Sequence, residues 1–326
     1  TNDDLKRLWP KNILPPVRGW YINSIKSGII TDGDVILDIS YNQVQKKKLT
    51  NESIIAKLNV SNVSVMYLKS FPLLTKSEGI IEITPKKFIG NLKSGIVNEV
   101  PISEGKIELN LKAPKQWIAD VEFIGKGNNK DIFNILNNKP INVSENFSIN
   151  EEKVFGESAS RVILNFPVRL DLTFDEVNFA AVTNLVNFGI NDIVNNINLS
   201  NANMLLNVTK NNLNVMGKGE LNNIPVNIEW NQNLQSKNVS TIKIDGKFSS
   251  NQFDLSQFGF LESIDGDISI DLSGEIKNNQ IKNADISLDL TKSKINIDFI
   301  NYIKKINEAA IIKFNYKNNK DDGSFV

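Results

Sequence analysis

Hydrophobic and polar residues alternate along most of this chain, and the alternation is most regular between Ser200 and Ile276. A period of two places the apolar residues on one face of a β-strand and the polar residues on the other. Clusters of Asn, Gly, Asp and Ser separate the alternating runs, as turns between strands require. The stretch therefore predicts about five or more antiparallel strands in a meander with one apolar face, which something has to cover.

The same alternation recurs outside this stretch and raises the expected total to about twenty strands, well above the ordinary share of β-structure. Strands in a sheet lie about 4.8 Å apart, so about twenty in one open sheet would extend roughly 100 Å. The further segments expected to contain strands are Gly28–Ser40, Ile54–Tyr67, Gly79–Thr84, Phe88–Leu92, Ser94–Glu99, Lys106–Lys112, Ala119–Gly125, Phe155–Val177, Asn178–Ile190, Ala284–Leu290, Ile295–Phe299 and Ala309–Tyr316.

Several residues interrupt the alternation and predict local irregularities. Two Asp-Gly-Asp triplets, at 32–34 and at 265–267, are interpreted as tight hairpin turns. The phase of the alternation slips at Ser61-Asn62, which predicts a bulge or a turn there. Pro167 predicts an edge or a break within the segment that contains it. Residues 321–326 carry no pattern and are expected to trail off after a final strand.

Helices are expected only as short interruptions of this pattern. Asp131 is expected to cap one of them, because an Asp side chain can accept a hydrogen bond from the first turn. Trp9, Trp20 and Tyr21, near the N-terminus, are interpreted as packing residues that close the end of the sheet. The expected helical segments are Asp3–Leu8, Val17–Ile25, Asp131–Asn137 and Asn301–Glu308.

Composition excludes several classes of function. The 326 residues include no cysteine and no histidine, so disulfides, thiol chemistry, His-ligated zinc and Ser-His-Asp catalysis are excluded. Thirty-seven basic and 37 acidic residues balance, which argues against a nucleic-acid partner because such a protein would carry a basic surplus. No motif predicts a metal site or a cofactor. The Gly-Lys-Gly triplets at 125–127 and 217–219 lack the spacing and the following helix of a phosphate loop.

The chain begins at Thr1 and has neither a signal peptide nor an apolar run long enough to span a bilayer. We expect residues 1–326 to form one elongated β-rich segment of a longer protein, with a possible subdivision into 1–150 and 151–326.

A set of weak markers, in order along the chain, resembles the AsmA-like, YhdP-type (TamB-related) envelope proteins of Gram-negative bacteria. Gly156, the strand that ends at Phe166-Pro167 and the run Leu199–Ala202 are three of them. The others resemble the family's segments "L-W-P … R-x-W" and "strand, G-x-G, turn, P-V, strand, W". Those residues are Leu8-Trp9-Pro10, Arg18-Gly19-Trp20, Gly217–Val226 and Trp230; Asn222-Asn223 depart from the family, which usually has a glycine there.

The resemblance implies a long antiparallel meander sheet folded over into an elongated groove, a β-taco, with a few short helices. It also implies a periplasmic body, anchored in the inner membrane by an N-terminal helix absent from this sequence and reaching toward outer-membrane components. In that family the groove is thought to carry phospholipid acyl chains without any catalytic step. The residues expected to line such a lipid path are Val208, Val215, Val226, Ile228, Trp230, Ile242, Ile244, Phe248, Ile268, Ile270, Leu272, Ile286 and Leu288.

Three functions therefore remain open from the sequence. The first is a non-enzymatic lipid-transfer segment that shields acyl chains between the two membranes. The second is a structural or adhesive β-solenoid spacer with a dry core, in which the same side chains fill the interior. The third is a carbohydrate-active enzyme with two carboxylates, for which pairs such as Glu151-Glu152 or Asp171/Asp175 show no sign of convergence.

Overall fold

The computed structural model describes residues 2–11, 15–46, 48–67, 69–113, 116–139, 141–147, 149–169, 171–194, 197–235, 239–252, 264–277, 280–319 and 322–325. The chain divides into two compact units. Unit 1 comprises residues 1–146 and 157–183, and unit 2 comprises residues 147–156 and 184–326. The two units are described separately below.

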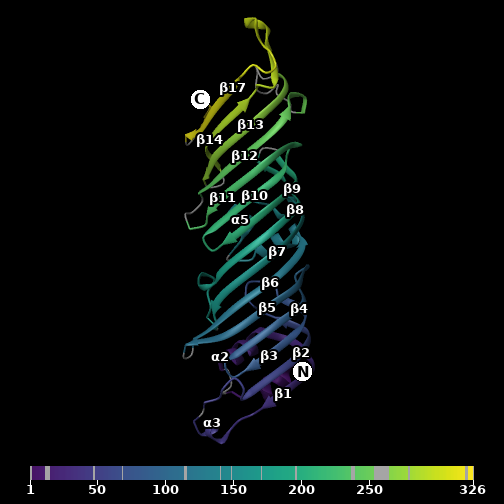
Figure 1. The fold of residues 1–326 in the computed structure, drawn as a ribbon, viewed down its shortest axis with the longest axis vertical. Coiled ribbons are helices and arrows are strands. Elements are labelled where there is room, and N and C mark those ends of the chain that lie inside the picture. The colour runs from purple at the N-terminus through teal and green to yellow at the C-terminus, as the bar shows by residue number, and fades with distance from the viewer. Residues whose placement is uncertain are drawn as a thin grey trace. The chain divides into compact units, whose positions relative to one another are not determined.

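The predicted fold class is confirmed. The chain is mainly β, and its strands form an open, curled antiparallel meander with few short helices (Figure 1). Most strands hydrogen-bond to their neighbours in the sequence, because turns of a few residues can join antiparallel strands directly.

The sheet of unit 1 follows the chain order without crossovers. Asn62 has a φ of 48°, and the pairing shifts between Val60 and Val63, so the bulge predicted at Ser61-Asn62 is confirmed. Pro167 ends its strand, as predicted. The strands are β1 (Ile25–Leu37), β2 (Ile54–Val65), β3 (Leu74–Thr84), β4 (Lys87–Val97), β5 (Val100–Ala113), β6 (Gln116–Asn128) and β7 (Val154–Pro167), whose first three residues belong to unit 2.

The sheet of unit 2 keeps the chain order as far as β14, which then pairs with β17. Between them, β15 and β16 form a hairpin whose first strand pairs with the start of β13. The strands are β8 (Asn178–Val194, shared with unit 1), β9 (Ile197–Thr209), β10 (Asn212–Leu221), β11 (Ile224–Asn233), β12 (Val239–Ser249), β13 (Ile264–Lys277), β14 (Gln280–Asp289), β15 (Ser293–Ile297), β16 (Tyr302–Lys304), β17 (Ile311–Asn319) and β18 (Asp322–Phe325).

The helices are short. The two N-terminal helices and a helix near Asp131 were predicted. The last of these begins at Asn129, so the predicted cap at Asp131 is wrong. Asn128 caps the helix instead, and its Oδ1 accepts from the Lys130 amide at 2.9 Å. The helices are α1 (Asn2–Leu8), α2 (Pro15–Ser24), α3 (Tyr41–Gln45), α4 (Asn129–Leu136) and α5 (Val143–Phe147), with 3₁₀ turns η1 (Glu151–Lys153), η2 (Phe174–Glu176), η3 (Ser250–Gln252) and η5 (Asp298–Ile300).

The two hairpin turns predicted at the Asp-Gly-Asp triplets are wrong. Asp32 and Gly33 lie inside β1, where they pair with Asn59 and Leu58. A Cβ on Gly33 would lie 2.6 Å from Leu58 Cδ2, so this glycine permits close strand packing. Gly266 lies inside β13 with a φ of 122°, and a Cβ there would lie 2.8 Å from the carbonyl oxygen of Lys292.

Two other predicted elements are also wrong. The strand predicted around Leu172 and Phe174 is instead a turn followed by η2, where the Glu176 carboxylate accepts from the Thr173 amide and pairs with Arg169. Leu170 lies outside the described residues. The helix predicted over 301–308 is interrupted at once, because Asn301 adopts a left-handed φ of 52° and β16 follows. β17 matches the predicted final strand, but β18 follows it.

The N-terminal residues cover part of the apolar face of unit 1. Trp9, Val17 and Tyr21 are buried against apolar residues of β4, β5 and β6, among them Phe88 and Leu109. The rings of Trp9 and Tyr21 lie 5.5 Å apart. The predicted packing role of these aromatic residues is therefore confirmed.

Hydrogen bonds join α1 to α2 above this core. The Arg18 guanidinium donates to the carbonyl oxygens of Trp9 and Lys6, at 3.0 Å each. The Tyr21 hydroxyl donates to Asn2 Oδ1 at 2.6 Å. Burial, with a smaller contribution from the nearby Asp3 carboxylate, raises the pKa of Tyr21 to about 12, so the hydroxyl keeps its proton at neutral pH.

The core of unit 2 lies beneath the β15–β16 hairpin. Its buried cluster includes Phe248, Ile268, Leu288, Leu290 and Ile295. Lys304 enters the same region and is only 2% exposed. Its ammonium donates to the carbonyl oxygens of Leu290 at 2.8 Å, Ser293 at 2.6 Å and Lys305 at 3.1 Å. The lysine therefore joins the base of the hairpin to the turn after β14.

The N-terminal core gives a test of unit 1 stability. Trp9→Ala should lower the free energy of unfolding by about 3–5 kcal/mol, because it removes a buried indole and leaves a cavity. Urea denaturation followed by circular dichroism measures this loss. The matched control is Leu8→Ala, whose side chain is 77% exposed and should change stability by less than about 0.5 kcal/mol. Equal effects would contradict the packing described here.

Lys304 gives a second test. Lys304→Met keeps the length and apolar stem of the side chain but leaves three carbonyl oxygens without their donor. We expect a loss of about 1–3 kcal/mol in the same denaturation experiment. Lys305→Met is the control, since the Lys305 side chain is exposed. A Lys304→Met protein as stable as the unmodified chain would show that the ammonium does not hold the hairpin.

Candidate functional site: the apolar face of unit 2

The residues predicted to line a lipid path all lie on one face of β9 to β14. Antiparallel pairing explains this, because directly opposite residues share a face. Val215 lies opposite Trp230, and Trp230 lies opposite Ile242. Two residues before Trp230 on the same strand, Ile228 lies opposite Ile244, and Ile244 lies opposite Leu272. We call this surface, from β9 to β14 and β17, the apolar face of unit 2.

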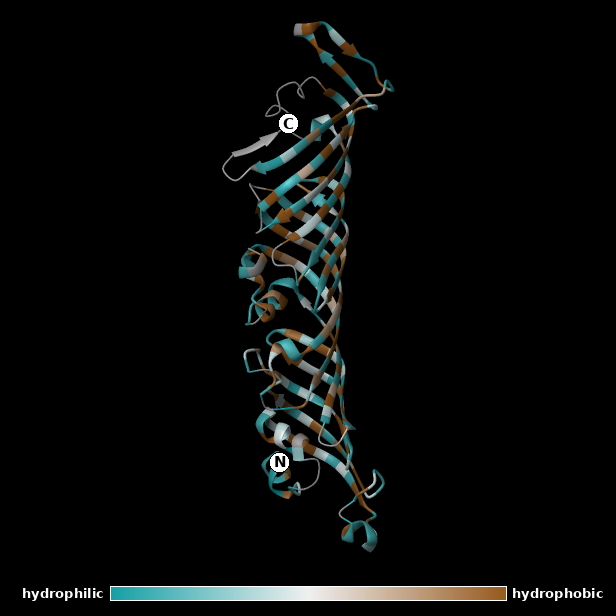
Figure 2. Ribbon diagram, turned by 90° about the vertical axis from the view of Figure 1, so that its left-hand side faces the viewer, coloured by the Kyte–Doolittle hydropathy of each residue, from teal (hydrophilic) through white to brown (hydrophobic). Residues whose placement is uncertain are grey.

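The opposite face of the same strands is polar. Glu229, beside Ile228, lies opposite Lys243, and Lys243 lies opposite Ser273. Asn227 donates to the Asp245 carboxylate at 2.5 Å across the same pair of strands. The brown and teal bands that alternate along the strands in Figure 2 show this two-sided character. The apolar face is therefore a property of the register as well as of the sequence pattern.

Burial divides the predicted residues into two groups. Val215, Val226, Phe248, Ile268 and Leu288 are buried, the last three in the core beneath the hairpin. The other group keeps part of each side chain accessible to solvent, although the side chains lie on the apolar side of the sheet. This half-buried group is Val208, Ile228, Trp230, Ile242, Ile244, Ile270, Leu272 and Ile286.

The sequence prediction missed other residues of this face. Met204 and Leu206 lie opposite Gly217 and Val215, and Phe314 lies opposite Ile286. All three are in phase with a predicted residue or strand: Met204 and Leu206 precede Val208 at a period of two, and Phe314 lies in the segment Ala309–Tyr316. Following the period to both ends of each strand would have found them.

Gly217 allows two strands to approach closely on the apolar face. A Cβ at this position would lie 2.3 Å from the carbonyl oxygen of Asn203 and 2.7 Å from Met204 Cγ. Only glycine fits such a space without movement of the backbone. The Gly-Lys-Gly triplet therefore has a packing role in the sheet.

The Trp230 ring contacts an aromatic ring from outside the sheet. The Phe147 ring, at the end of α5, meets the Trp230 ring edge-on, with centroids 5.8 Å apart and an interplanar angle of 87°. The indole Nε1 of Trp230 is buried and has no hydrogen-bond acceptor among the described residues. A buried donor without an acceptor costs about 1–3 kcal/mol, so this position on the apolar face is less stable than a fully satisfied one.

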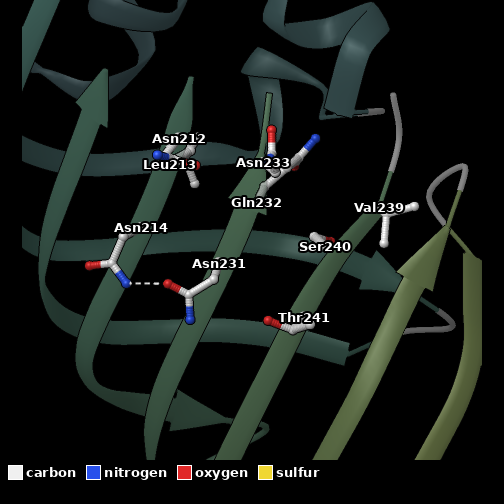
Figure 3. Close-up of a pocket in the computed structure, with 9 residues that line it drawn as sticks. All are labelled: Asn212, Leu213, Asn214, Asn231, Gln232, Asn233, Val239, Ser240 and Thr241. Atoms are coloured by element: carbon white, nitrogen blue, oxygen red, sulfur yellow. Dashed lines mark hydrogen bonds between the residues drawn. The ribbon is translucent and has the colours of Figure 1, made fainter. Parts of the chain in front are cut away.

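Two shallow depressions lie on unit 2, and neither follows the predicted lipid path. The smaller, about 370 Å³, is formed by the ends of β10, β11 and β12 (Figure 3). Its amides already bond one another: Asn214 donates to Asn231 Oδ1 at 2.6 Å, and Asn231 donates to Glu229 Oε1 at 2.9 Å. These amides therefore stabilise neighbouring strands.

The larger depression, about 540 Å³, contains two of the predicted residues, Val226 and Ile270, among mostly polar neighbours. One of them is Asp289. Hydrogen bonds from Thr291 lower the pKa of this carboxyl, with smaller contributions from the charges of Lys304 and Lys247. The carboxylate thus remains ionised at neutral pH on an exposed polar rim.

Carboxylates elsewhere form no metal-binding group in the described part of the chain. Asp32 and Asp34 lie inside β1, whereas calcium sites usually take their oxygen ligands from a loop. Of the pair Asp171/Asp175, Asp171 lies 3.4 Å from the Arg169 guanidinium. Asp171 therefore has a cationic neighbour in this segment.

None of the helices in the described ranges is both long enough and apolar enough to cross a bilayer. Comparison with protein-family models, curated proteins and solved structures finds no match to this chain. The resemblance to AsmA-like envelope proteins therefore stays a prediction from the sequence, and the site has to be interpreted from its own geometry.

The close strand contact at Gly217 can be tested directly. Gly217→Ala should lower the free energy of unfolding by about 1–3 kcal/mol, because the new methyl group overpacks the contact with Asn203 and Met204. Thermal and urea denaturation measure the change. Gly19→Ala in α2 is the control: no atom lies within 4 Å of its Cβ position, and alanine favours the helix. A stabilising Gly217→Ala would refute the close contact.

Proposed function

We propose that the apolar face of unit 2 shields phospholipid acyl chains, and that the chain is a non-enzymatic segment of a lipid-transfer path. The observation that carries this proposal is the half-buried row formed by Ile228, Ile244, Leu272 and Ile286. Large aliphatic side chains aligned across neighbouring strands gain free energy when an apolar ligand covers them.

The size of this face suits an acyl chain. From β9 to β14 and on to β17 the face crosses seven strands, which corresponds to roughly 30 Å at about 4.8 Å per strand step. The hydrocarbon core of a bilayer, two leaflets deep, is also about 30 Å thick, so one acyl chain is about half that length. Each methylene transferred from water to the face contributes about 0.8 kcal/mol.

Trp230 adds a polar group to this otherwise apolar surface. Its Nε1–H is buried and has no acceptor among the described residues. The ester oxygens that join acyl chains to glycerol are hydrogen-bond acceptors that this donor could use. This donor favours an ester-linked lipid over a plain hydrocarbon.

The cellular setting of the proposal rests on the sequence resemblance. In that setting the chain would belong to a periplasmic protein anchored in the inner membrane, with phospholipid as its cargo and outer-membrane components as further partners. The balanced charge of the chain suits a path that holds acyl chains while binding no headgroup tightly.

A structural spacer with a dry core is the second candidate function, and unit 1 supplies the observation that favours it. There the side chains of Trp9, Val17 and Tyr21 fill the apolar face, so this part of the chain covers its own sheet. If the face of unit 2 were covered by protein in the same way, it would have no room for lipid.

Site-specific photo-crosslinking tests the lipid proposal. A benzophenone amino acid at Ile244, on the apolar face, should crosslink to phospholipid that copurifies with the protein, and mass spectrometry should detect the adduct. The matched control is the same amino acid at Lys243, the preceding residue, whose side chain points to the polar face. We expect at least a tenfold higher yield of lipid adduct at Ile244.

Equal yields at the two positions would show that the label reports only non-specific lipid contact. A folded protein that gives no lipid adduct at Ile244, even after incubation with phospholipid, would reject lipid shielding and favour the spacer.

A further inference from the structure

The first strand of unit 1, β1, has a free edge. It pairs with β2, and no other strand in the described part of the chain pairs with it. In Figure 1, β1 is the outermost strand of unit 1. A strand with a free edge presents backbone N–H and C=O groups that another extended chain can bond. Every residue from 32 to 38 is exposed, and we call this segment the β1 edge.

The β1 edge is regular enough to accept a further strand. Proteins usually protect such an edge with prolines, lysines or bulges. The register shifts of β1 all lie before Asp32, and from Asp32 to Leu37 each residue pairs with β2 in unbroken register. The segment contains neither proline nor lysine. An added strand would therefore continue the pairing of the sheet without a local rearrangement.

Large apolar side chains are exposed on the β1 edge. Val35 is 60% exposed, Ile36 57% and Leu37 67%. Val35 and Leu37 lie opposite Ala56 and Ile54, and Ala56 packs against the core of unit 1. A strand with apolar residues at alternate positions would cover Val35 and Leu37 and extend that apolar face by one strand.

The other face of the β1 edge is acidic. Asp32 and Asp34 share this face with Ile36, and Asp38 continues the same alternation just after the strand. On β2, Lys57 lies opposite Asp34 and is the single basic residue of that strand. No ion pair joins a lysine to any of these three carboxylates in the described ranges. Acidic residues are therefore in excess on this face of the strand pair.

The same carboxylates disfavour a second copy of this chain as the partner. Two β1 strands could pair antiparallel about a two-fold axis, with one residue of each at the centre. Every such pairing centred on one of residues 32–36 brings two aspartates opposite each other. A centre at Gly33, for example, brings Asp32 opposite Asp34 of the other copy. Like charges directly opposite one another destabilise a strand pair, whereas opposite charges stabilise it.

We propose that the β1 edge binds an extended segment of another protein whose residues alternate between basic and apolar. The segment adds one strand to the sheet of unit 1, its backbone bonds the free edge, and its apolar residues cover Val35 and Leu37. Its basic residues lie beside Asp32, Asp34 and Asp38. This inference concerns unit 1 and is independent of lipid shielding by unit 2.

Peptide binding to the full chain tests the proposal. The probe is acetyl-KVKIKVK-amide, which matches the β1 edge in length, and its counterpart is acetyl-EVEIEVE-amide. Isothermal titration calorimetry should give at least tenfold tighter binding of the lysine peptide, because charge pairs replace charge repulsion on the acidic face. Hydrogen exchange of the amides of residues 32–37 should slow when this peptide binds. Absence of binding, or equal affinity for the two peptides, would overturn the proposal.

A charge-reversal variant tests the location. Asp32→Lys with Asp38→Lys should reverse the preference between the two peptides, and it leaves Asp34 beside Lys57. The matched control is Glu104→Lys with Asp271→Lys, the same charge change at exposed residues of strands that are paired on both sides. This control should keep the preference for the lysine peptide. Equal behaviour of the two variants would show that the peptides report only net charge.

A third measurement separates strand addition from simple charge attraction. The lysine peptide with alternate backbone amides methylated keeps its charges and side chains but loses donors along one edge. It should bind at least tenfold more weakly, and equal binding would refute strand addition. Sedimentation of the unmodified chain tests the remaining occupant: a dimer in which residues 32–37 are protected from exchange would assign the edge to a second copy and overturn the proposal.

Discussion

The structure depends on cross-strand register. Apolar residues repeat at a period of two along each strand, but a shift of one residue between neighbours would place them opposite polar residues. In unit 2 the register instead brings Val215 opposite Trp230 and Ile228 opposite Ile244. Because each strand repeats this match with the next one, many short runs of alternation become one apolar face. The polar back of the sheet, the core beneath the hairpin and the proposed lipid path all follow from that match.

The two units cover this kind of face in different ways. In unit 1, α1, α2 and the aromatic residue Trp9 supply a lid from the chain itself, fixed by the hydrogen bonds of Arg18. In unit 2 the cover over the described residues is partial: the hairpin packs at one end, and Phe147 meets Trp230. Where the chain provides its own cover, the sheet is a structural core. Where aliphatic side chains stay half-buried, the sheet can bind an apolar ligand, and this difference is the basis of the proposed function.

The hairpin of unit 2 is anchored by a buried charge. The buried Lys304 ammonium has lost its hydrating water and donates instead to backbone carbonyl oxygens. These hydrogen bonds fix the turn after β14 against the base of the hairpin. The same short strand that buries this lysine exposes Tyr302 and Ile303, the two residues before it.

The sequence by itself determined the β-class, most strand positions and the sharing of one face by residues of the same strand, such as Ile228 and Trp230. A period of two is a local signal, because neighbouring Cβ atoms of any strand point to opposite sides. The cap at Asn128, the continuous strands through Gly33 and Gly266, and the strand at Tyr302–Lys304 were decided by tertiary structure. Asp-Gly pairs favour turns locally, but the hydrogen bonds of a long partner strand outweigh that preference. The local pattern likewise identifies which side chains are apolar. Whether another part of the protein covers those side chains depends on segments that are distant in the sequence. Burial can therefore be assigned only when those segments are placed in space.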